Sequence, residues 1–278
     1  MKKTNQITGL NRNIIDKYYT KNIIAELCIE YIKENIKIDV NDLIIEPSAG
    51  NGSFIKGIKS LTNNYKFYDI EPENNEIIKQ DFLQYSIDNF PVGDVNKIHI
   101  IGNPPFGRQS SLAIQFIKKC CEFSNNISFI LPKSFKKDSL KKSFPLCFHL
   151  IFERDLPEKS FLVNNIEYDV PCIFQIWQKK EICRNINDKL IPLNFMFVKK
   201  DENPDISFRR VGVNAGIIDI NIDKKSMQSH YFIKFTNNLT IDENIKKLSQ
   251  IKFEFNNTVG PKSISKQELI YKFNPLLL

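Results

Sequence analysis

The hydrophobic pattern of the first 180 residues predicts helices that alternate with strands. Segment 20–36 is amphipathic, and Thr20 or Asn22 is positioned to cap the helix that it predicts. Its apolar side chains at helical spacing are Ile24, Leu27, Cys28, Tyr31 and Ile32. Segment 110–123 predicts a second helix, capped by Ser110 or Ser111. The apolar face of that helix carries Ala113, Phe116, Ile117 and Cys120.

Short apolar runs between these helices predict strands. The runs lie within segments 42–46, 63–74, 97–106, 127–132, 149–156 and 169–179. Strands that are apolar throughout and alternate with helices are typical of a mainly parallel sheet that is covered on both faces. The close pair at the end of the series predicts a hairpin-like finish. We therefore expect residues 1–180 to form one doubly wound α/β domain.

The pattern loosens after residue 180, where short strand-like pieces are separated by irregular stretches. Residues 181–278 are therefore expected to form a small C-terminal unit, either α+β or mainly β, which is a candidate for substrate recognition. Four aromatic residues in it are expected in its core: Phe195, Phe197, Phe232 and Phe235.

The composition favours a soluble chain that is not exported, and we expect a cytoplasmic or nuclear protein. No run approaches the roughly 18 apolar residues of a membrane span, and segment 1–13 lacks the apolar core of a secretory signal. The six cysteines show no CxxC pairing and only three histidines accompany them, so neither a zinc site nor a disulfide framework is expected.

The charge of the chain is concentrated near its C-terminal end. The net charge is +7, and the part from Lys179 onward holds 17 basic and 11 acidic residues, an excess of six. Such an excess favours a polyanionic partner, although a solvated basic face explains it equally well.

Two strand ends carry residues that suit a nucleotide-like ligand, which in an open parallel sheet binds at the carboxyl ends of the strands. Segment 46–53, EPSAGNGS, contains Gly50 and Gly52, which let the backbone approach a ligand closely. Asp69 or Glu71 follows the next strand, at the distance where a carboxylate can hold ribose hydroxyls.

A third group, Asp81 with Phe82, offers an acceptor for an adenine amino group beside an aromatic face, although Phe82 is equally typical of a protein core. The sequence has neither a P-loop lysine signature nor a GxGxxG motif. A ligand with a sugar and a base but little phosphate therefore fits better than ATP or NAD. S-adenosylmethionine (SAM) is such a ligand.

The segment GNPPF, residues 102–106, ends another predicted strand. Asn103 offers a side-chain carbonyl and Pro104 a rigid backbone carbonyl, both of them acceptors, beside the aromatic face of Phe106. An exocyclic amino group on a planar base needs this arrangement, because two acceptors bind its two N–H hydrogens and orient its lone pair toward a methyl donor.

The ordered motifs KYYT (17–20), EPSAGNGSF (46–54), DIEP (69–72), DF (81–82) and NPPF (103–106) resemble the SAM-dependent amino-methyltransferases that act on adenine N6, especially the gamma-ordered DNA adenine methyltransferases. The resemblance covers roughly residues 14–178. It implies a seven-stranded class I methyltransferase sheet and direct, metal-free methyl transfer to nitrogen.

The resemblance also implies roles for individual residues. Tyr19, Thr20, Glu46, Ala49 and Gly50 would lie against the methionine part of the cofactor. Asp69 would bind the ribose, Asp81 the adenine amino group and Phe82 the adenine face. The cofactor-binding set also includes Pro47, Ile70 and Asn103. The target amino group would be held by Asn103, Pro104, Pro105 and Phe106.

The substrate stays open between DNA and RNA, with DNA favoured. The short C-terminal region limits sequence-specific reading of DNA, and phenylalanine at position 106 also occurs in RNA adenine methyltransferases of the mRNA-cap type. Alternative acceptors are guanine N2 in ribosomal RNA and a glutamine side chain of release factors, and a catalytically inactive nucleic-acid-binding subunit is a third reading.

Basic residues at two places in the chain are candidates for contacts with phosphate. They are Lys133, Lys136, Lys137, Arg209, Arg210 and Lys262. The sequence leaves open whether the chain forms a homodimer or joins a partner subunit.

Overall fold

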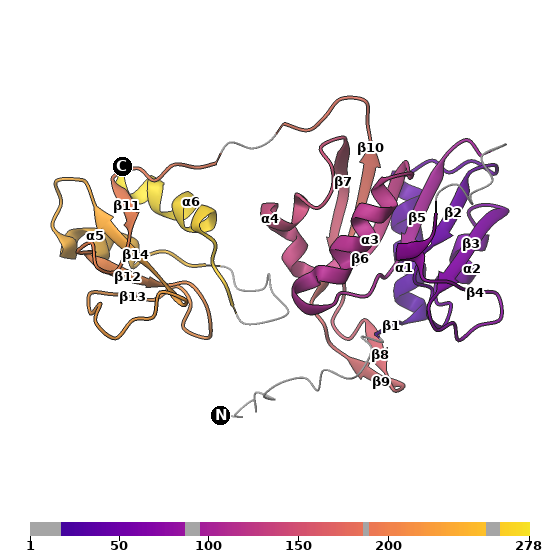
Figure 1. Cartoon of the computed structure of the whole chain (residues 1–278), viewed down its shortest axis with the longest axis horizontal. Helices are drawn as coiled ribbons and strands as arrows, with labels where there is room; N and C mark the ends of the chain where they lie inside the picture. Colours follow the sequence, from indigo (N-terminus) through magenta and orange to yellow (C-terminus); the bar gives the residue numbers. More distant parts are fainter. Residues whose placement is uncertain (1–17, 87–94, 186–188, 254–261) are drawn as a thin grey trace. The chain divides into compact units, whose positions relative to one another are not determined.

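A computed structural model describes residues 18–86, 95–185, 189–253 and 262–278. The chain divides into two compact units, Met1–Arg184 and Asn185–Leu278 (Figure 1). The boundary that the sequence predicts, between residues 180 and 181, lies close to this division, and the assignment of a catalytic and a recognition role to the two parts stays a prediction. No helix in the described ranges is both long and apolar enough to cross a membrane.

Unit 1 is built on a seven-stranded sheet with the strand order β4-β3-β2-β5-β6-β10-β7. The strands are β2 (Leu43–Glu46), β3 (Asn64–Asp69), β4 (Ile78–Lys79), β5 (Ile98–Gly102), β6 (Asn126–Pro132), β7 (Phe148–Asp155) and β10 (Cys172–Lys179). β10 runs antiparallel to both of its neighbours, and the pairs among the first five strands are parallel. The predicted doubly wound, mainly parallel sheet is confirmed.

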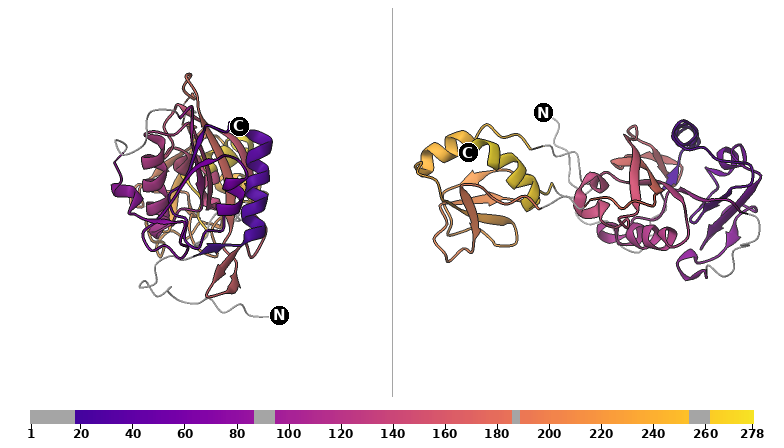
Figure 2. Two further views of the ribbon diagram at one scale, coloured as in Figure 1. Left: turned by 90° about the vertical axis from the view of Figure 1, so that its right-hand side faces the viewer. Right: turned by 90° about the horizontal axis from the view of Figure 1, so that it is seen from above.

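The alternation of side chains along the strands explains why helices cover both faces of this sheet. Ile44 belongs to the core under α1 (Asn22–Asn35) and α2 (Ile55–Lys59). Its neighbours Leu43 and Ile45 belong to the core under α3 (Ser111–Cys121). Figure 2 shows the indigo α1 and the magenta α3 on opposite sides of the sheet. Short helical turns complete unit 1: η1 (Phe82–Gln84), η3 (Arg108–Ser110), η4 (Lys133–Lys136) and α4 (Asp138–Lys141).

The predicted helix caps need correction. Lys21 is the N-cap of α1 and makes no capping hydrogen bond through its side chain. Thr20 instead belongs to strand β1 (Tyr19–Thr20), and Asn22 is the first helical residue. Ser110 is the N-cap of α3, one of the two predicted positions. Its side chain makes no capping hydrogen bond, and its backbone is left-handed, with φ 62°.

A second, three-stranded sheet in unit 1 was not predicted. It has the order β1-β8-β9, with β8 (Phe161–Val163) and β9 (Ile166–Tyr168). The predicted hairpin-like finish is the antiparallel pair of β7 and β10. The β8–β9 hairpin lies within the connection between these two strands.

Unit 2 is α+β, one of the two predicted alternatives. Its antiparallel sheet has the order β11-β14-β12-β13, with β11 (Phe195–Val198), β12 (Ile206–Arg209), β13 (Ile218–Asp219) and β14 (His230–Phe235). Two helices with capping boxes complete the unit: α5 (Ile241–Leu248) and α6 (Lys266–Leu277). The prediction of aromatic core residues is confirmed, since Phe195 and Phe232 are buried and Phe197 and Phe235 pack against the core.

Candidate functional site

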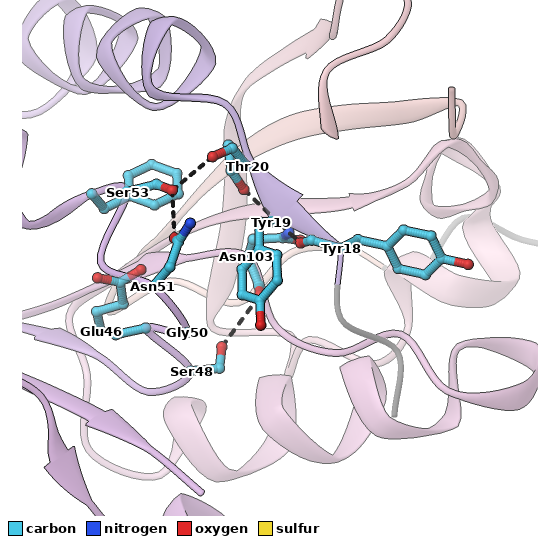
Figure 3. A pocket seen from close by; sticks show the side chains of 11 residues that line it. Tyr18, Tyr19, Thr20, Glu46, Ser48, Gly50, Asn51, Ser53 and Asn103 are labelled. Carbon is cyan, nitrogen blue, oxygen red and sulfur yellow. Dashed lines mark hydrogen bonds between the residues drawn. The ribbon is translucent and has the colours of Figure 1, made fainter. Parts of the chain in front are cut away.

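A pocket lies where β2 and β5 end, and β1 forms one of its walls (Figure 3). Its cavity volume is about 40 Å³. This is far below the roughly 300–1,000 Å³ of pockets that bury a whole drug-sized ligand, so the pocket suits one end of a larger molecule. Its lining residues are Tyr18, Tyr19, Thr20, Glu46, Ser48, Ala49, Gly50, Asn51, Ser53, Phe54 and Asn103.

The amide of Asn103 has a defined orientation in this pocket. Its Nδ2 atom donates hydrogen bonds to the carbonyl oxygen of Tyr18 and to Oγ1 of Thr20, both at 3.2 Å. Its Oδ1 atom is buried and has no hydrogen-bond partner among the described residues. Because both amide hydrogens are engaged, the side chain offers a ligand an acceptor and no donor.

Glu46 brings a second buried acceptor to the same pocket. The side chain is 2 % exposed, and its Oε2 atom has no partner in the described ranges. Burial raises the pKa of this carboxyl well above its ordinary value, and the nearby charge of Asp69 raises the pKa further. A cationic ligand group would stabilise the ionised form of Glu46 and supply the missing hydrogen bond.

The glycine turn after β2 brings backbone and carboxylate together. Gly50 has a φ of +56°, and its N–H donates to Oδ2 of Asp69 at 2.7 Å. The other carboxylate oxygen of Asp69 accepts from the N–H of Glu71 at 2.8 Å. A Cβ atom at Gly50 would lie 3.4 Å from the ring of Tyr19, so glycine keeps this wall of the pocket open.

The NPPF turn continues directly from β5 into α3. Pro104 is buried, and no group in the described ranges donates to its carbonyl oxygen. Phe106 is half-buried, contacts both hydrophobic cores, and accepts a backbone hydrogen bond from Leu112 through its carbonyl oxygen. The turn therefore offers a backbone acceptor and a partly accessible ring beside Asn103.

A match to a known family extends over just more than half of the chain. Residues 42–185 match the family model described as the EDM2 methyltransferase-like domain. The chain belongs to this family. This chain is 32% identical over 143 residues to protein ENHANCED DOWNY MILDEW 2 of Arabidopsis thaliana. That match covers 47% of this chain and 10% of the plant protein, so the chain spans about a tenth of the length of its relative.

Solved structures resemble this EDM2-like domain only distantly. The 23S rRNA methyltransferase ErmE is 13% identical with a TM-score of 0.44, and the match covers 61% of this chain and 72% of that one. The N-methyltransferase NodS from Bradyrhizobium japonicum WM9 is 10% identical with a TM-score of 0.40, over 62% of this chain and 100% of that one. The fold assignment rests on the strand order described above.

The methyltransferase-like family and the class I sheet of this EDM2-like domain imply SAM as its cofactor. The residues present fit that molecule at its charged end. SAM carries a sulfonium and an ammonium group, and the pocket contains the buried carboxylate of Glu46, which lacks a partner for Oε2 within the described part of the chain. Gly50 leaves room for such a ligand beside Tyr19.

The pocket of unit 1 brings together six of the predicted site residues: Tyr19, Thr20, Glu46, Ala49, Gly50 and Asn103. Asp69 reaches the pocket through its hydrogen bond to Gly50, and Ile70 beside it is 58% exposed. The other predicted residues are not among those that line the pocket: Pro47, Asp81, Phe82, Pro104, Pro105 and Phe106.

Asp81 and Phe82 have structural roles in the described fold. The Asp81 carboxylate caps η1 by accepting from the N–H of Leu83 at 3.0 Å. Phe82 is 2% exposed and packs among the core aromatics Tyr68 and Phe116. The assignment of the Phe82 ring to the adenine face therefore stays a prediction.

Five pocket residues were not predicted individually: Tyr18, Ser48, Asn51, Ser53 and Phe54. All five lie within the motifs KYYT and EPSAGNGSF, so the motifs predicted their place in the chain. The sequence did not predict which side chains of these motifs face the pocket. Lys17 of the first motif lies outside the described residues.

The predicted phosphate contacts stay a prediction, and several of these side chains have partners within the protein. Lys133 and Lys136 form ion pairs with Asp155 at 2.9 and 2.6 Å, which reduces their positive field. In unit 2, the Arg210 guanidinium lies 5.4 Å from the ring centroid of Tyr231, and Arg209 donates to the carbonyl of Val211. Within the described ranges, no cluster of three or more histidine, cysteine or acidic side chains could hold a metal ion.

Proposed function

We propose that this EDM2-like domain transfers a methyl group from SAM to the N6 amino group of adenine in nucleic acid, with DNA ahead of RNA as substrate. The observation that carries the proposal is the buried Oδ1 atom of Asn103, which has no partner among the described residues. A buried acceptor without a partner is costly, and an amino group is a ligand that would satisfy it.

The chain's own groups would position the acceptor nitrogen. Oδ1 of Asn103 and the carbonyl oxygen of Pro104 would accept its two hydrogens, and the ring of Phe106 would stack on the base. When bound, SAM supplies an electrophilic methyl group on a sulfonium. Transfer would form an N–C bond in place of the S–C bond and release S-adenosylhomocysteine, and the amino group would lose one proton to solvent.

The choice of DNA over RNA rests on the resemblance of the ordered motifs to the gamma-ordered DNA adenine methyltransferases. The position of KYYT before EPSAGNGSF disfavours glutamine and guanine as acceptors. The excess of basic residues in the C-terminal region supports a polyanionic substrate. A glutamine side chain also carries an amino group with two hydrogens, so direct identification of the product is required.

The test is incubation of the full chain with labelled SAM and, separately, DNA, structured RNA, capped RNA and a release factor. Mass spectrometry then identifies the modified nucleoside or residue. We expect N6-methyladenine, most strongly in DNA. Methylation of guanine or glutamine in place of adenine would contradict the proposal.

The variant Asn103→Ala tests the role of the NPPF turn. We expect methyl transfer to fall by about 10²–10³-fold, as is typical when an oriented hydrogen-bonding group at a reaction centre is removed. SAM affinity should stay within about threefold, measured by calorimetry. Asn35→Ala is the control, because that amide only donates to the carbonyl of Tyr31 within α1. Normal turnover of Asn103→Ala would refute this role.

A further inference from the structure

We infer that Thr20 is a positioning residue: its hydroxyl, together with the carbonyl of Tyr18, locks the Asn103 amide so that the site accepts amino groups and rejects oxo groups. This inference rests on the proposed function. It assigns to β1 a task separate from contact with the cofactor, and it restricts the substrate to groups that donate hydrogen bonds.

The two acceptors for Asn103 Nδ2 come from alternate residues of the same short segment. The carbonyl oxygen of Tyr18 and Oγ1 of Thr20 each lie 3.2 Å from Nδ2 (Figure 3). If the amide rotated by half a turn, its oxygen would face both of these oxygens. The carbonyl of Tyr18 has no hydrogen to give, so the rotated amide would lose at least one hydrogen bond and gain a repulsive contact.

β1 is itself fixed by elements from two distant parts of unit 1. Tyr19 and Thr20 pair with Leu162 and Phe161 of β8. The Lys21 N–H donates to the carbonyl of Ser160 at 3.1 Å, and Ser53 Oγ donates to the carbonyl of Thr20 at 2.7 Å. The β8–β9 hairpin and the glycine turn therefore hold the strand that orients Asn103.

The locked amide has a consequence for substrate choice. An amino group meets Oδ1 with a donor, whereas an oxo group at the same place brings an acceptor against an acceptor. Sites built to pair with a donor discriminate strongly against an analogue that lacks it, because the buried group is then left unpaired. A 6-oxopurine in place of adenine should therefore bind poorly at this position.

The variants Thr20→Val and Thr20→Ser separate the hydroxyl from the shape of the side chain. For Thr20→Val we expect kcat at saturating SAM to fall about tenfold, while KM for nucleic acid stays within about twofold. Thr20→Ser, which keeps the hydroxyl, should stay within about threefold of the unmodified chain in kcat. If Thr20→Val raised only the Kd for SAM and left kcat unchanged, Thr20 would be a cofactor contact and the inference would be wrong.

Thr62→Val is the matched control. Thr62 is also a buried threonine, and its hydroxyl donates to the carbonyl oxygens of Val40 and Asp42, outside the set of residues that line the pocket. A loss of kcat in Thr62→Val equal to that in Thr20→Val would show a general effect on stability and would overturn the inference.

A competitor oligonucleotide with hypoxanthine at the target position measures the rejection of oxo groups. We expect it to bind the unmodified chain at least about tenfold more weakly than the adenine oligonucleotide. In Thr20→Val, the ratio of the two dissociation constants should be smaller. If this ratio were the same in Thr20→Val as in the unmodified chain, the result would count against the locked amide.

Proton exchange of the Asn103 side-chain amide, followed by ¹⁵N NMR, tests the lock without any substrate. We expect slow exchange in the unmodified chain and exchange about fivefold faster in Thr20→Val, with Asn103→Ala assigning the signals. If no nucleic acid is methylated but this difference is found, the positioning role stands and the proposed function falls. Equal exchange in both proteins would refute the positioning role.

Discussion

Glu46 and Asn103 each keep one buried oxygen without a partner among the described residues. Buried acceptors of this kind cost free energy in the ligand-free protein, typically about 1–3 kcal/mol each. The cost is relieved only when a ligand brings donors or positive charge. At the scale of residues, the two oxygens support the proposal that Glu46 binds the cationic end of the cofactor and that Asn103 accepts from a donor.

The raised pKa of Glu46 predicts that SAM affinity depends on pH. A bound cation favours the ionised carboxylate, so binding releases the proton that burial retains in the free protein. Affinity should rise as pH increases from the ordinary pKa of glutamate toward the raised pKa of Glu46. Calorimetry between about pH 5 and 7.5, below the titration of an α-amino group, measures this rise.

Glu46→Gln is the matching variant. It should bind SAM at least about tenfold more weakly at the upper end of this range, because a hydrogen bond to a charged group is lost. Its affinity should be nearly independent of pH. If the SAM affinity of Glu46→Gln rose with pH as steeply as that of the unmodified chain, the result would show that another group binds the cation.

Sequence patterns located Glu46 and Asn103 because short motifs at predicted strand ends carry strong local signals. The same patterns gave no sign that Asn103 donates to Thr20, since the two residues are 83 positions apart. Long-range contacts of this kind depend on how β1 pairs with β8, and two-residue strands leave no periodic signal.

At the scale of elements, the turn from β5 to α3 concentrates unusual backbone. Gly107, Gln109 and Ser110 all have positive φ, at 67°, 53° and 62°. Left-handed residues other than glycine are costly and cluster where the surrounding structure must hold a site in place. This costly backbone follows directly after Asn103, the residue of the turn that lines the pocket.

Gly107→Ala tests whether this turn requires glycine at position 107. An added Cβ would lie 2.8 Å from Cγ of Leu112 and would also suffer the positive φ, so we expect a loss of about 1–3 kcal/mol in unfolding free energy. Thermal unfolding should shift down by about 2–4 °C for each kcal/mol. Ser111→Ala, at an exposed position in the first turn of α3, should change the transition little. Equal stability of both variants would show that the turn relaxes freely.

The elements with clear apolar patterns were predicted correctly, including the four-residue strand β2, but the two- and three-residue strands β1, β8 and β9 were not. The face of α3 that carries Ala113, Phe116 and Ile117 is buried as expected. The β8–β9 hairpin was missed because its strands have three residues each and β9 is exposed along its length. In α1, the buried face includes Ala25 and Ile29, whereas Leu27 is only half-buried. The buried face is therefore rotated about the helix axis from the predicted one, and the spacing of apolar residues alone does not determine this rotation.

At the scale of the whole molecule, residues 185–278 carry 14 basic and 10 acidic residues, a net charge of +4. If Arg209 and Arg210 bind phosphates, the double variant with alanine at both positions should weaken nucleic-acid binding. The slope of log K against log salt should become shallower by about 2, because each phosphate contact contributes about 0.9. Fluorescence anisotropy at several salt concentrations measures this slope.

The control for this experiment removes the same charge elsewhere in the same unit. Lys246 and Lys247 lie in α5, and alanine at both positions changes the net charge by the same amount. We expect that variant to retain most of the affinity and the slope. Equal losses in the two double variants would point to net charge alone. An unchanged slope in both would exclude Arg209 and Arg210 from contact with phosphate.

The position of β10 also has a consequence for biosynthesis. β10 lies between β6 and β7, although both of those strands precede it in the chain. Until residues 172–179 leave the ribosome, β6 has one open edge, and all seven of its residues belong to the buried interior of the finished sheet. Open apolar edges promote association of nascent chains. The seven-stranded sheet can therefore close only after translation has passed Lys179, and a pause shortly before that point would leave this edge of β6 exposed.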